Sequence, residues 1–158
     1  MTRHDQSASD GKPVVTTDDL IDVPPVLTAR KGEVTAVVTG VPSPVQVPGT
    51  GAFRIGGATA VVTTDIEGLT FPASYTTESE SVLGQGVVTF ELTSAHASTH
   101  VRTAYPPVAA VIDAGSFDLV FTVGDPAKNQ GGASVDTPGT TYSTTVAFKR
   151  HHVGVVAD

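Results

Sequence analysis

Five histidines are the residues whose type and spacing most suggest chemistry in this chain: His4, His96, His100, His151 and His152. If His96 and His100 lay on a helix, their spacing would present two imidazoles to one metal ion. The residues between them are small or β-branched and favour a strand, on which the two rings would lie roughly 13 Å apart. A shared site would then need His151 or His152 to approach from another strand. We therefore predict a solvated polar face here and no metal site.

Carboxylates form three pairs that are close in the sequence. General acid–base catalysis needs two carboxyl groups that converge in a cleft and have different environments. The pairs are Asp65 with Glu67, Glu78 with Glu80, and Asp113 with Asp118. All three fall in predicted turns or polar loops, where acids are usually only solvated. Asp125 with Asn129 or Asp136 could offer oxygens to calcium, but the ligand spacing of an EF-hand is absent.

No enzymatic sequence signature is found. The phosphate-binding Gly-x-x-x-x-Gly-Lys loop and the Gly-x-Ser-x-Gly nucleophile elbow are both missing. The chain has no Trp and three Tyr, so a carbohydrate site would lack most of its usual stacking groups. We predict no catalytic, cofactor-binding or metal-ligating residue and no cofactor. An enzyme stays a third alternative, for which His96, His100 and His151 are the residues to test.

The segment Ala110-Val111-Ile112-Asp113-Ala114-Gly115 resembles the nucleoside-binding hairpin of the trimeric dUTPases, a β-barrel family of similar length. That family continues with a Tyr three residues after the Asp, where this chain has Ser116. Its Arg-Ser-Gly motif and its glycine-rich C-terminal motif have no counterpart here. A resemblance of six residues in 158 implies no nucleotide chemistry, and we base no function on it.

Composition indicates an all-β protein. The 158 residues include 25 Val and 23 Thr but only 6 Leu and 4 Lys, which favours strands over helices. The formal net charge of −7 argues against a nucleic-acid groove, which would need clustered Lys and Arg. Cysteine is absent, which excludes disulfides. We expect no secretory signal, because the N-terminus has no apolar h-region, and no membrane span, because no apolar stretch approaches the required ~20 residues.

Two segments define the centre of the predicted core. Residues 87–93 place Val88, Phe90 and Leu92 on one face, and residues 117–123 alternate in the same way. Successive side chains of a strand point to opposite faces, so each segment reads as a strand with one buried face. The inward residues of the second segment are Phe117, Leu119, Phe121 and Val123.

Further strands are predicted at short intervals along the chain. They cover residues 33–39, 53–55, 59–66, 69–71, 96–103, 108–113 and 141–149, with Val153–Val156 as one more candidate. Prolines place residues 41–48 on an edge or in a loop, because proline lacks the donor that a central strand needs. About nine short strands with frequent turns are typical of a sandwich or a barrel. We predict a single antiparallel β-sandwich of jelly-roll or immunoglobulin-like type, with a β-barrel as the alternative.

The chain divides into an extended polar N-terminal arm, residues 1–25, and a β-sandwich domain, residues 26–158. The arm is rich in Asp, Ser and Thr and ends at Pro24-Pro25, so alone it cannot bury enough apolar surface to order itself. We expect it to pair with the sheet edge of a neighbouring chain. Deletion of residues 1–25 should then leave a folded domain that no longer joins its assembly.

These features predict a non-enzymatic structural assembly subunit. The most plausible setting is a virus or phage particle, in which the chain would be a capsid decoration or a tail component located in the virion. Its partners would be copies of itself or other structural subunits, with no nucleic acid and no membrane. The alternative is an adhesion or carbohydrate- or protein-binding module that recognises a glycan or receptor through a loop such as Gly124–Gly139.

Overall fold

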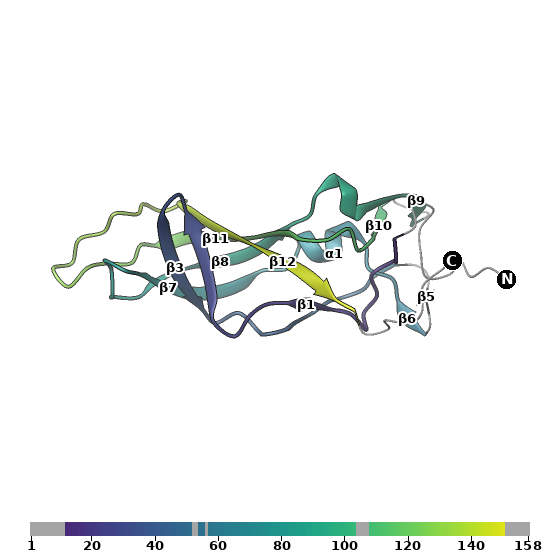
Figure 1. The fold of residues 1–158 in the computed structure, drawn as a ribbon, viewed down its shortest axis with the longest axis horizontal. Helices are drawn as coiled ribbons and strands as arrows, with labels where there is room; N and C mark the ends of the chain where they lie inside the picture. Colours follow the sequence, from purple (N-terminus) through teal and green to yellow (C-terminus); the bar gives the residue numbers. More distant parts are fainter. Residues whose placement is uncertain (1–11, 52–53, 56, 104–107, 151–158) are drawn as a thin grey trace.

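The computed structural model describes residues 12–51, 54–55, 57–103 and 108–150 (Figure 1). Its regular secondary structure is almost entirely β, as the composition predicts. The strands are β1 (Leu20–Asp22), β2 (Leu27–Lys31), β3 (Val34–Thr39), β4 (Val45–Gln46), β5 (Arg54–Ile55), β6 (Ala58–Thr59), β7 (Phe71–Thr77), β8 (Gly84–Glu91), β9 (Ala97–Arg102), β10 (Ala109–Val111), β11 (Phe117–Asp125) and β12 (Thr141–Lys149). The two short helices are α1 (Thr63–Glu67) and a 3-10 turn at Ser94–His96.

Six antiparallel strands close into a barrel. Their order is β11-β8-β7-β3-β2-β12, and β12 pairs back onto β11. The closing pair β11–β12 extends from Phe117↔Val146 to Thr122↔Thr141, whereas β12 meets β2 at Ser143↔Arg30. The predicted sandwich is therefore corrected to its barrel alternative. The physical reason is that β12 pairs on both sides, so one sheet curves round a single core instead of two sheets facing each other.

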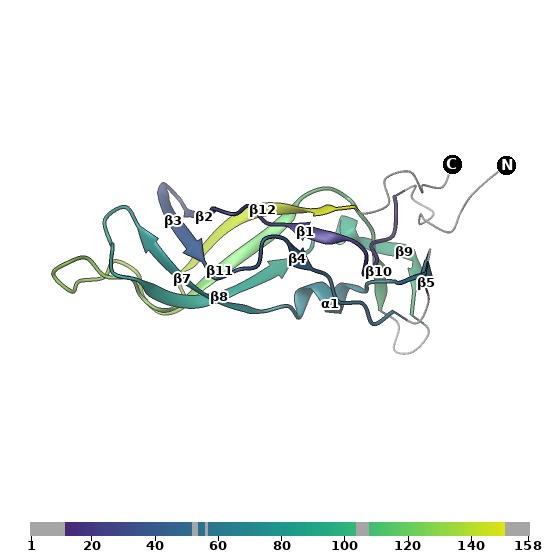
Figure 2. The same ribbon diagram turned by 90° about the horizontal axis from the view of Figure 1, so that it is seen from below.

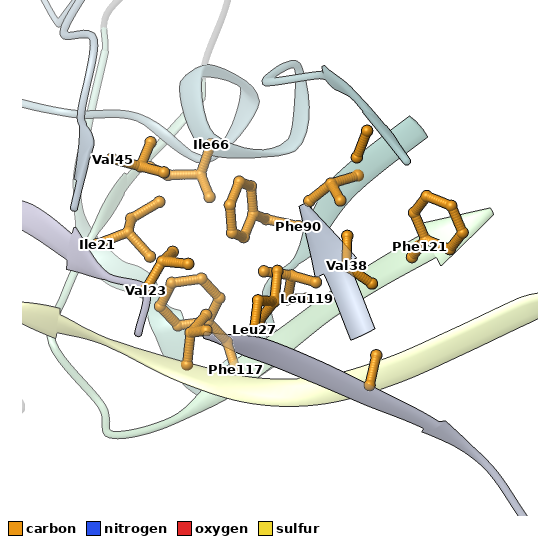
Figure 3. Close-up of a cluster of buried hydrophobic side chains, with 14 of the residues drawn as sticks. Ile21, Val23, Leu27, Val38, Val45, Ile66, Phe90, Phe117, Leu119 and Phe121 are labelled. Carbon is orange, nitrogen blue, oxygen red and sulfur yellow. The ribbon is translucent and has the colours of Figure 1, made fainter. Parts of the chain in front are cut away.

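The predicted central strands form the heart of the barrel. β8 and β11 pair along nearly their whole length, with Leu119 opposite Phe90 and Phe121 opposite Val88. All four of these side chains are buried. Figure 3 shows Phe90, Phe117 and Leu119 meeting in the core. The period-two pattern thus identified both the strands and their inward faces, and it did the same for Tyr142, Val146 and Phe148 on β12.

The segment that follows residue 11 is packed into the barrel, although the sequence assigns it to the arm. Val14, Val15, Ile21 and Val23 are buried. β1 pairs with β12 on one side and with β4 on the other. The polar composition of the segment is outweighed because its few apolar residues fill the core. The folded domain therefore begins before the boundary predicted at residue 25. Residues 1–11 lie outside the described part of the chain.

The strand predicted at residues 59–66 is wrong for most of its length. β6 ends at Thr59, and Thr63–Glu67 forms α1. The carboxylate of Asp65 accepts hydrogen bonds from the backbone N–H of Val62 and of Thr50, which holds this single turn in place. Ile66 on α1 is fully buried and points at Phe90 (Figure 3). Val153–Val156, the last predicted strand, lies outside the described residues.

The molecule is elongated and its two ends differ (Figures 1 and 2). One end, here called the loop end, consists of residues 78–83 and 126–140, which connect β7 to β8 and β11 to β12. The other end, here called the base end, contains β5, β6, β9, β10 and residues 12–17. A second small apolar cluster lies there, separate from the main core: Val14, Ile55, Ala60, Ala110 and Ile112.

Candidate functional site

Of the five histidines, the structure describes the side chain of His96. His96 is 1% exposed on the 3-10 turn, so the solvated polar face predicted for it is wrong. Its ring packs edge-on against Phe117, with 5.5 Å between the ring centroids. Nε2 donates to the carbonyl of Gly115 at 3.0 Å, and Nδ1 accepts from the hydroxyl of Thr93 at 2.8 Å. Both ring nitrogens are thus occupied, and His96 is a structural residue of the core.

The side chains of the other four histidines are not described. The backbone of His100 lies in β9, and its side chain is not described. His4, His151 and His152 lie outside the described residues, so whether they approach His96 or His100 is not tested. Across the described ranges, no group of three or more His, Asp and Glu side chains is placed to hold a metal ion.

The three carboxylate pairs do not converge. Asp65 supports α1 and also accepts a hydrogen bond from the hydroxyl of Thr50 at 2.6 Å. Glu80 is buried and accepts hydrogen bonds from the hydroxyl of Thr77 and the backbone N–H of Val135. Their partners in sequence, Glu67 and Glu78, are exposed. Asp113 and Asp118 likewise lie apart, the first after β10 and the second on the outer face of β11.

The calcium candidates are also engaged elsewhere. The side-chain oxygen of Asn129 accepts from the backbone N–H of Gly131 at 2.9 Å and of Ala133 at 3.0 Å. Asp125 is exposed and lies 3.9 Å from Lys128. Asp136 is 5% exposed and has three donors from the protein itself. These oxygens serve to fix the loop end.

Asp136 forms a buried polar cluster with Lys31, Tyr75 and Tyr142, here called the Asp136 cluster. The hydroxyls of Tyr75 and Tyr142 donate to Oδ2 of Asp136 at 2.6 and 2.8 Å. Lys31 Nζ donates to Oδ1 at 2.6 Å and lies 5.3 Å from the centre of the Tyr142 ring. The Tyr75 oxygen in turn accepts the backbone N–H of Ala127 at 3.0 Å. β2, β7, β12 and the loop after β11 are therefore joined at one carboxylate.

The cluster stabilises the ionised carboxylate and the neutral phenols. Burial by itself raises the pKa of the Asp136 carboxyl, but the hydrogen bonds from Lys31, Tyr75 and Tyr142 outweigh it and hold that pKa below its ordinary value. Burial, followed by the hydrogen bond to Asp136, raises the pKa of both Tyr75 and Tyr142 far above the ordinary value. The groups are thus matched to each other, with no proton poised for transfer near neutral pH.

A second set of contacts joins the two loops of the loop end. Val82 and Lys128 exchange backbone hydrogen bonds of 2.9 and 3.1 Å. The buried carboxylate of Glu80 holds the N–H of Val135 at 2.7 Å. Gly84 allows this approach, because a Cβ there would collide with the ring of Tyr75 and the backbone of Ala127. Each loop therefore supports the other.

Two pockets lie on the described surface near β4 and near the turn after β7. One pocket of about 560 Å³ lies beside β4 and is mainly apolar: Pro42, Pro44, Gln46, Val47, Pro48, Leu69 and Phe71 line it. A smaller one of about 370 Å³ lies between Glu33 and Glu78 and has no basic or imidazole side chain in its lining. Neither has an imidazole in its lining. No helix among the described residues is long and apolar enough to cross a bilayer.

The Asp136 cluster is the polar feature that sequence reasoning missed. The alternation of β12 predicted that Tyr142 points inward, but it does not tell which polar group its hydroxyl meets. Asp136 stands in a loop rich in Gly and Pro, where an acid is expected to be solvated. The only signal was a tyrosine at an inward position, since a buried hydroxyl needs a partner.

Comparison with known proteins gives one family. A sequence model of the family described as contractile injection system spike tip protein matches residues 9–157, nearly the whole chain. No individual curated protein matches the chain.

Proposed function

The chain belongs to the family of contractile injection system spike tip proteins, and on that premise we propose that it is a non-enzymatic structural subunit at the tip of the spike of a phage tail-like particle. The family match over residues 9–157 is the observation that carries this proposal. It supports the tail component of the predicted pair and gives no support to capsid decoration. A recognition module for a glycan or receptor has no observation in its favour.

The described structure supports a mechanical role. A closed barrel has no free sheet edges, so its strands hold one another on both sides. The acids and the one described imidazole are committed to internal hydrogen bonds or lie apart on the surface. A subunit of this kind works through its shape and its contacts with neighbouring subunits.

We further propose that residues 1–11 contribute to those contacts. They carry no long apolar run, so they have little to bury on their own chain. Lys12, the first described residue, lies at the base end, because Pro13 accepts a hydrogen bond from the N–H of Asp113 just after β10. An arm that starts there can reach a neighbour seated against the base end.

The test is the composition of purified particles from cells that produce either the full chain or a variant lacking residues 1–11. We expect the full chain to co-purify with the particle and the shortened chain to fold but to be largely lost from it. Absence of the full chain from the particle would refute the proposed function. Normal retention of the shortened chain would refute only the role of the arm.

Deletion of residues 1–25 is the matched comparison for folding. It also removes Val14, Val15, Ile21 and Val23 from the core, together with β1. Loss of several buried aliphatic side chains costs an amount comparable to the whole stability of a small domain. We therefore expect this longer deletion to abolish folding, measured by circular dichroism, whereas the shorter one leaves the thermal transition cooperative.

A further inference from the structure

We propose that the C-terminal segment of the chain, residues 151–158, packs into the apolar pocket beside β4, here called the β4 groove. This assignment goes beyond the proposed function, because it concerns a single chain and gives an occupant to a surface that the role of a tail component does not use. Three observations carry it: the lining of the groove, the place where the described chain ends, and the residues that follow that end.

The β4 groove is an apolar surface at the edge of a sheet. β4 is the last strand in the eight-stranded order, and among the described strands it pairs with β1 alone. The groove is lined by partly buried Leu69 and Phe71, which pack against the main core, and by prolines that flank β4, and no charged side chain lines it. Such a lining favours aliphatic side chains and disfavours charged ones. Since proline has no N–H to donate, an occupant of this edge must be held mainly by side-chain contacts.

The described chain ends close to this groove. Lys149 on β12 and Gln46 on β4 both pair with Leu20 of β1, one on each side. Neighbouring strands are spaced by about 4.8 Å, so Lys149 and Gln46 are about 10 Å apart. The next residue, Arg150, has its Nε 3.1 Å from a carboxylate oxygen of Asp19, which directly precedes β1. The chain therefore leaves β12 beside β1, one strand away from the groove.

Arg150 also has buried donors that lack acceptors. Its Nε and Nη1 atoms are buried and donate no hydrogen bond to the described residues, because the contact with Asp19 is not aligned as one. Buried polar groups in proteins are nearly always hydrogen-bonded, so acceptors are expected at this place. A segment that turns back across β1 from Arg150 supplies them as backbone carbonyl groups.

Residues 151–158 have the composition and the length that the groove requires. Their sequence is His-His-Val-Gly-Val-Val-Ala-Asp, so three valines follow the two histidines. An extended chain advances about 3.3 Å per residue, so the residues from Arg150 to His152 are enough to cross β1 and to bring Val153 to the groove. The segment at the other end of the chain, residues 1–11, is a poor occupant, because its only apolar side chains are those of Met1 and Ala8.

The valines would remove the lining of the groove from water. This matters for a subunit that must contact only its proper neighbours, because an exposed apolar patch promotes association with other proteins. The segment is thus the part of the chain that closes its own surface beside β4.

Engineered disulfides test the placement, because the chain has no cysteine of its own. The test variant combines Gln46→Cys in the groove with Val155→Cys in the segment. The matched control combines Thr145→Cys with Val155→Cys. Thr145 is exposed and lies four residues before Lys149 on β12, about 13 Å along the strand, so a segment without a fixed place reaches it as easily as Gln46. Each purified variant is treated with a mild oxidant, and the free thiols that remain are alkylated and counted by mass spectrometry.

We expect the Gln46–Val155 pair of cysteines to close within one chain at least about tenfold faster than the control pair, because the groove holds the two thiols at a high effective concentration. Equal rates would show that the segment has no fixed place and would overturn the proposal. Disulfides that join two chains, seen as dimers, would also overturn it and would assign the groove to a second copy.

Hydroxyl-radical footprinting gives an independent measure that needs no cysteine. In a variant that lacks residues 153–158, we expect oxidation of Phe71 to rise severalfold, because the proposed cover of the groove is gone. Val87 is exposed on the outer face of β8 and should keep its rate in both proteins. An unchanged rate at Phe71 would contradict the proposal, even if the cysteine variants fold poorly.

Discussion

At the scale of residues, Asp136 is the side chain on which the loop end most depends. Three donors from β2, β7 and β12 meet its carboxylate, and its neighbour Val135 is held by Glu80. The sequence predicted correctly that Tyr142 points inward, but it could not predict this meeting, because Tyr75 and Lys31 lie 61 and 105 residues from Asp136 in the chain. His96 shows the same limit: its neighbours suggest a polar strand face, and two aromatic rings from other strands bury it.

We expect Asp136→Asn to lower the free energy of unfolding by roughly 1–3 kcal/mol at pH 7, because buried donors lose an ionised acceptor. Asp125→Asn is the matched control. It removes the carboxylate at the end of β11, beside the loop that carries Asp136, and the Asp125 side chain is 67% exposed. We expect that variant to stay within about 0.5 kcal/mol of the wild type. Urea denaturation measures both. Equal effects of the two substitutions would contradict the assigned role of Asp136.

The pH dependence of stability gives a second measure of the same contact. In the folded protein the pKa of the Asp136 carboxyl lies below its ordinary value of 3.8. Unfolding is therefore accompanied by proton uptake as the pH falls below 3.8. Its contribution is therefore complete above pH 3.8 and is lost as the pH falls. The two tyrosines act in the opposite direction, and their contribution is lost as the pH rises above 10.0. We expect Asp136→Asn to flatten the acid side of the profile, and an unchanged slope would count against the cluster.

At the scale of elements, period-two alternation predicted the long strands well. β8, β11 and β12 bury the side chains that the pattern places inward. A strand has only two faces, and in this barrel one of them packs against the core. Prediction failed where a few side chains override the pattern. The segment Thr63–Glu67 reads as part of a strand, yet Asp65 bonds the N–H of Val62 and the chain turns into α1. The apolar pair Val14-Val15 similarly draws a polar segment into the core.

The turn at residues 129–133 gives a test at this scale. Asn129→Ala removes the acceptor of the N–H groups of Gly131 and Ala133. We expect hydrogen exchange at these amides to become about tenfold or more faster, with little change in the melting temperature, because the turn projects beyond the barrel. Gln130→Ala alters the adjacent exposed side chain and serves as the control. Faster exchange in the control as well would show that Asn129 has no special role.

At the scale of the whole molecule, the sequence identified an all-β body but not its closure. A sequence of alternating strands is equally compatible with a sandwich and with a barrel, because both architectures bury one face of each strand. The decision rests on the pairing of β12 with both β11 and β2, and the link to β2 is the single pair Ser143↔Arg30. A pairing so short leaves no trace in local composition.

The most direct test of this account is electron microscopy of intact particles with and without this chain. We predict that particles with the chain carry a narrow density at the extremity of the spike, which fits the elongated barrel. Particles made without the chain should lack this density and be otherwise complete. Identical spike ends in the two preparations would contradict the account.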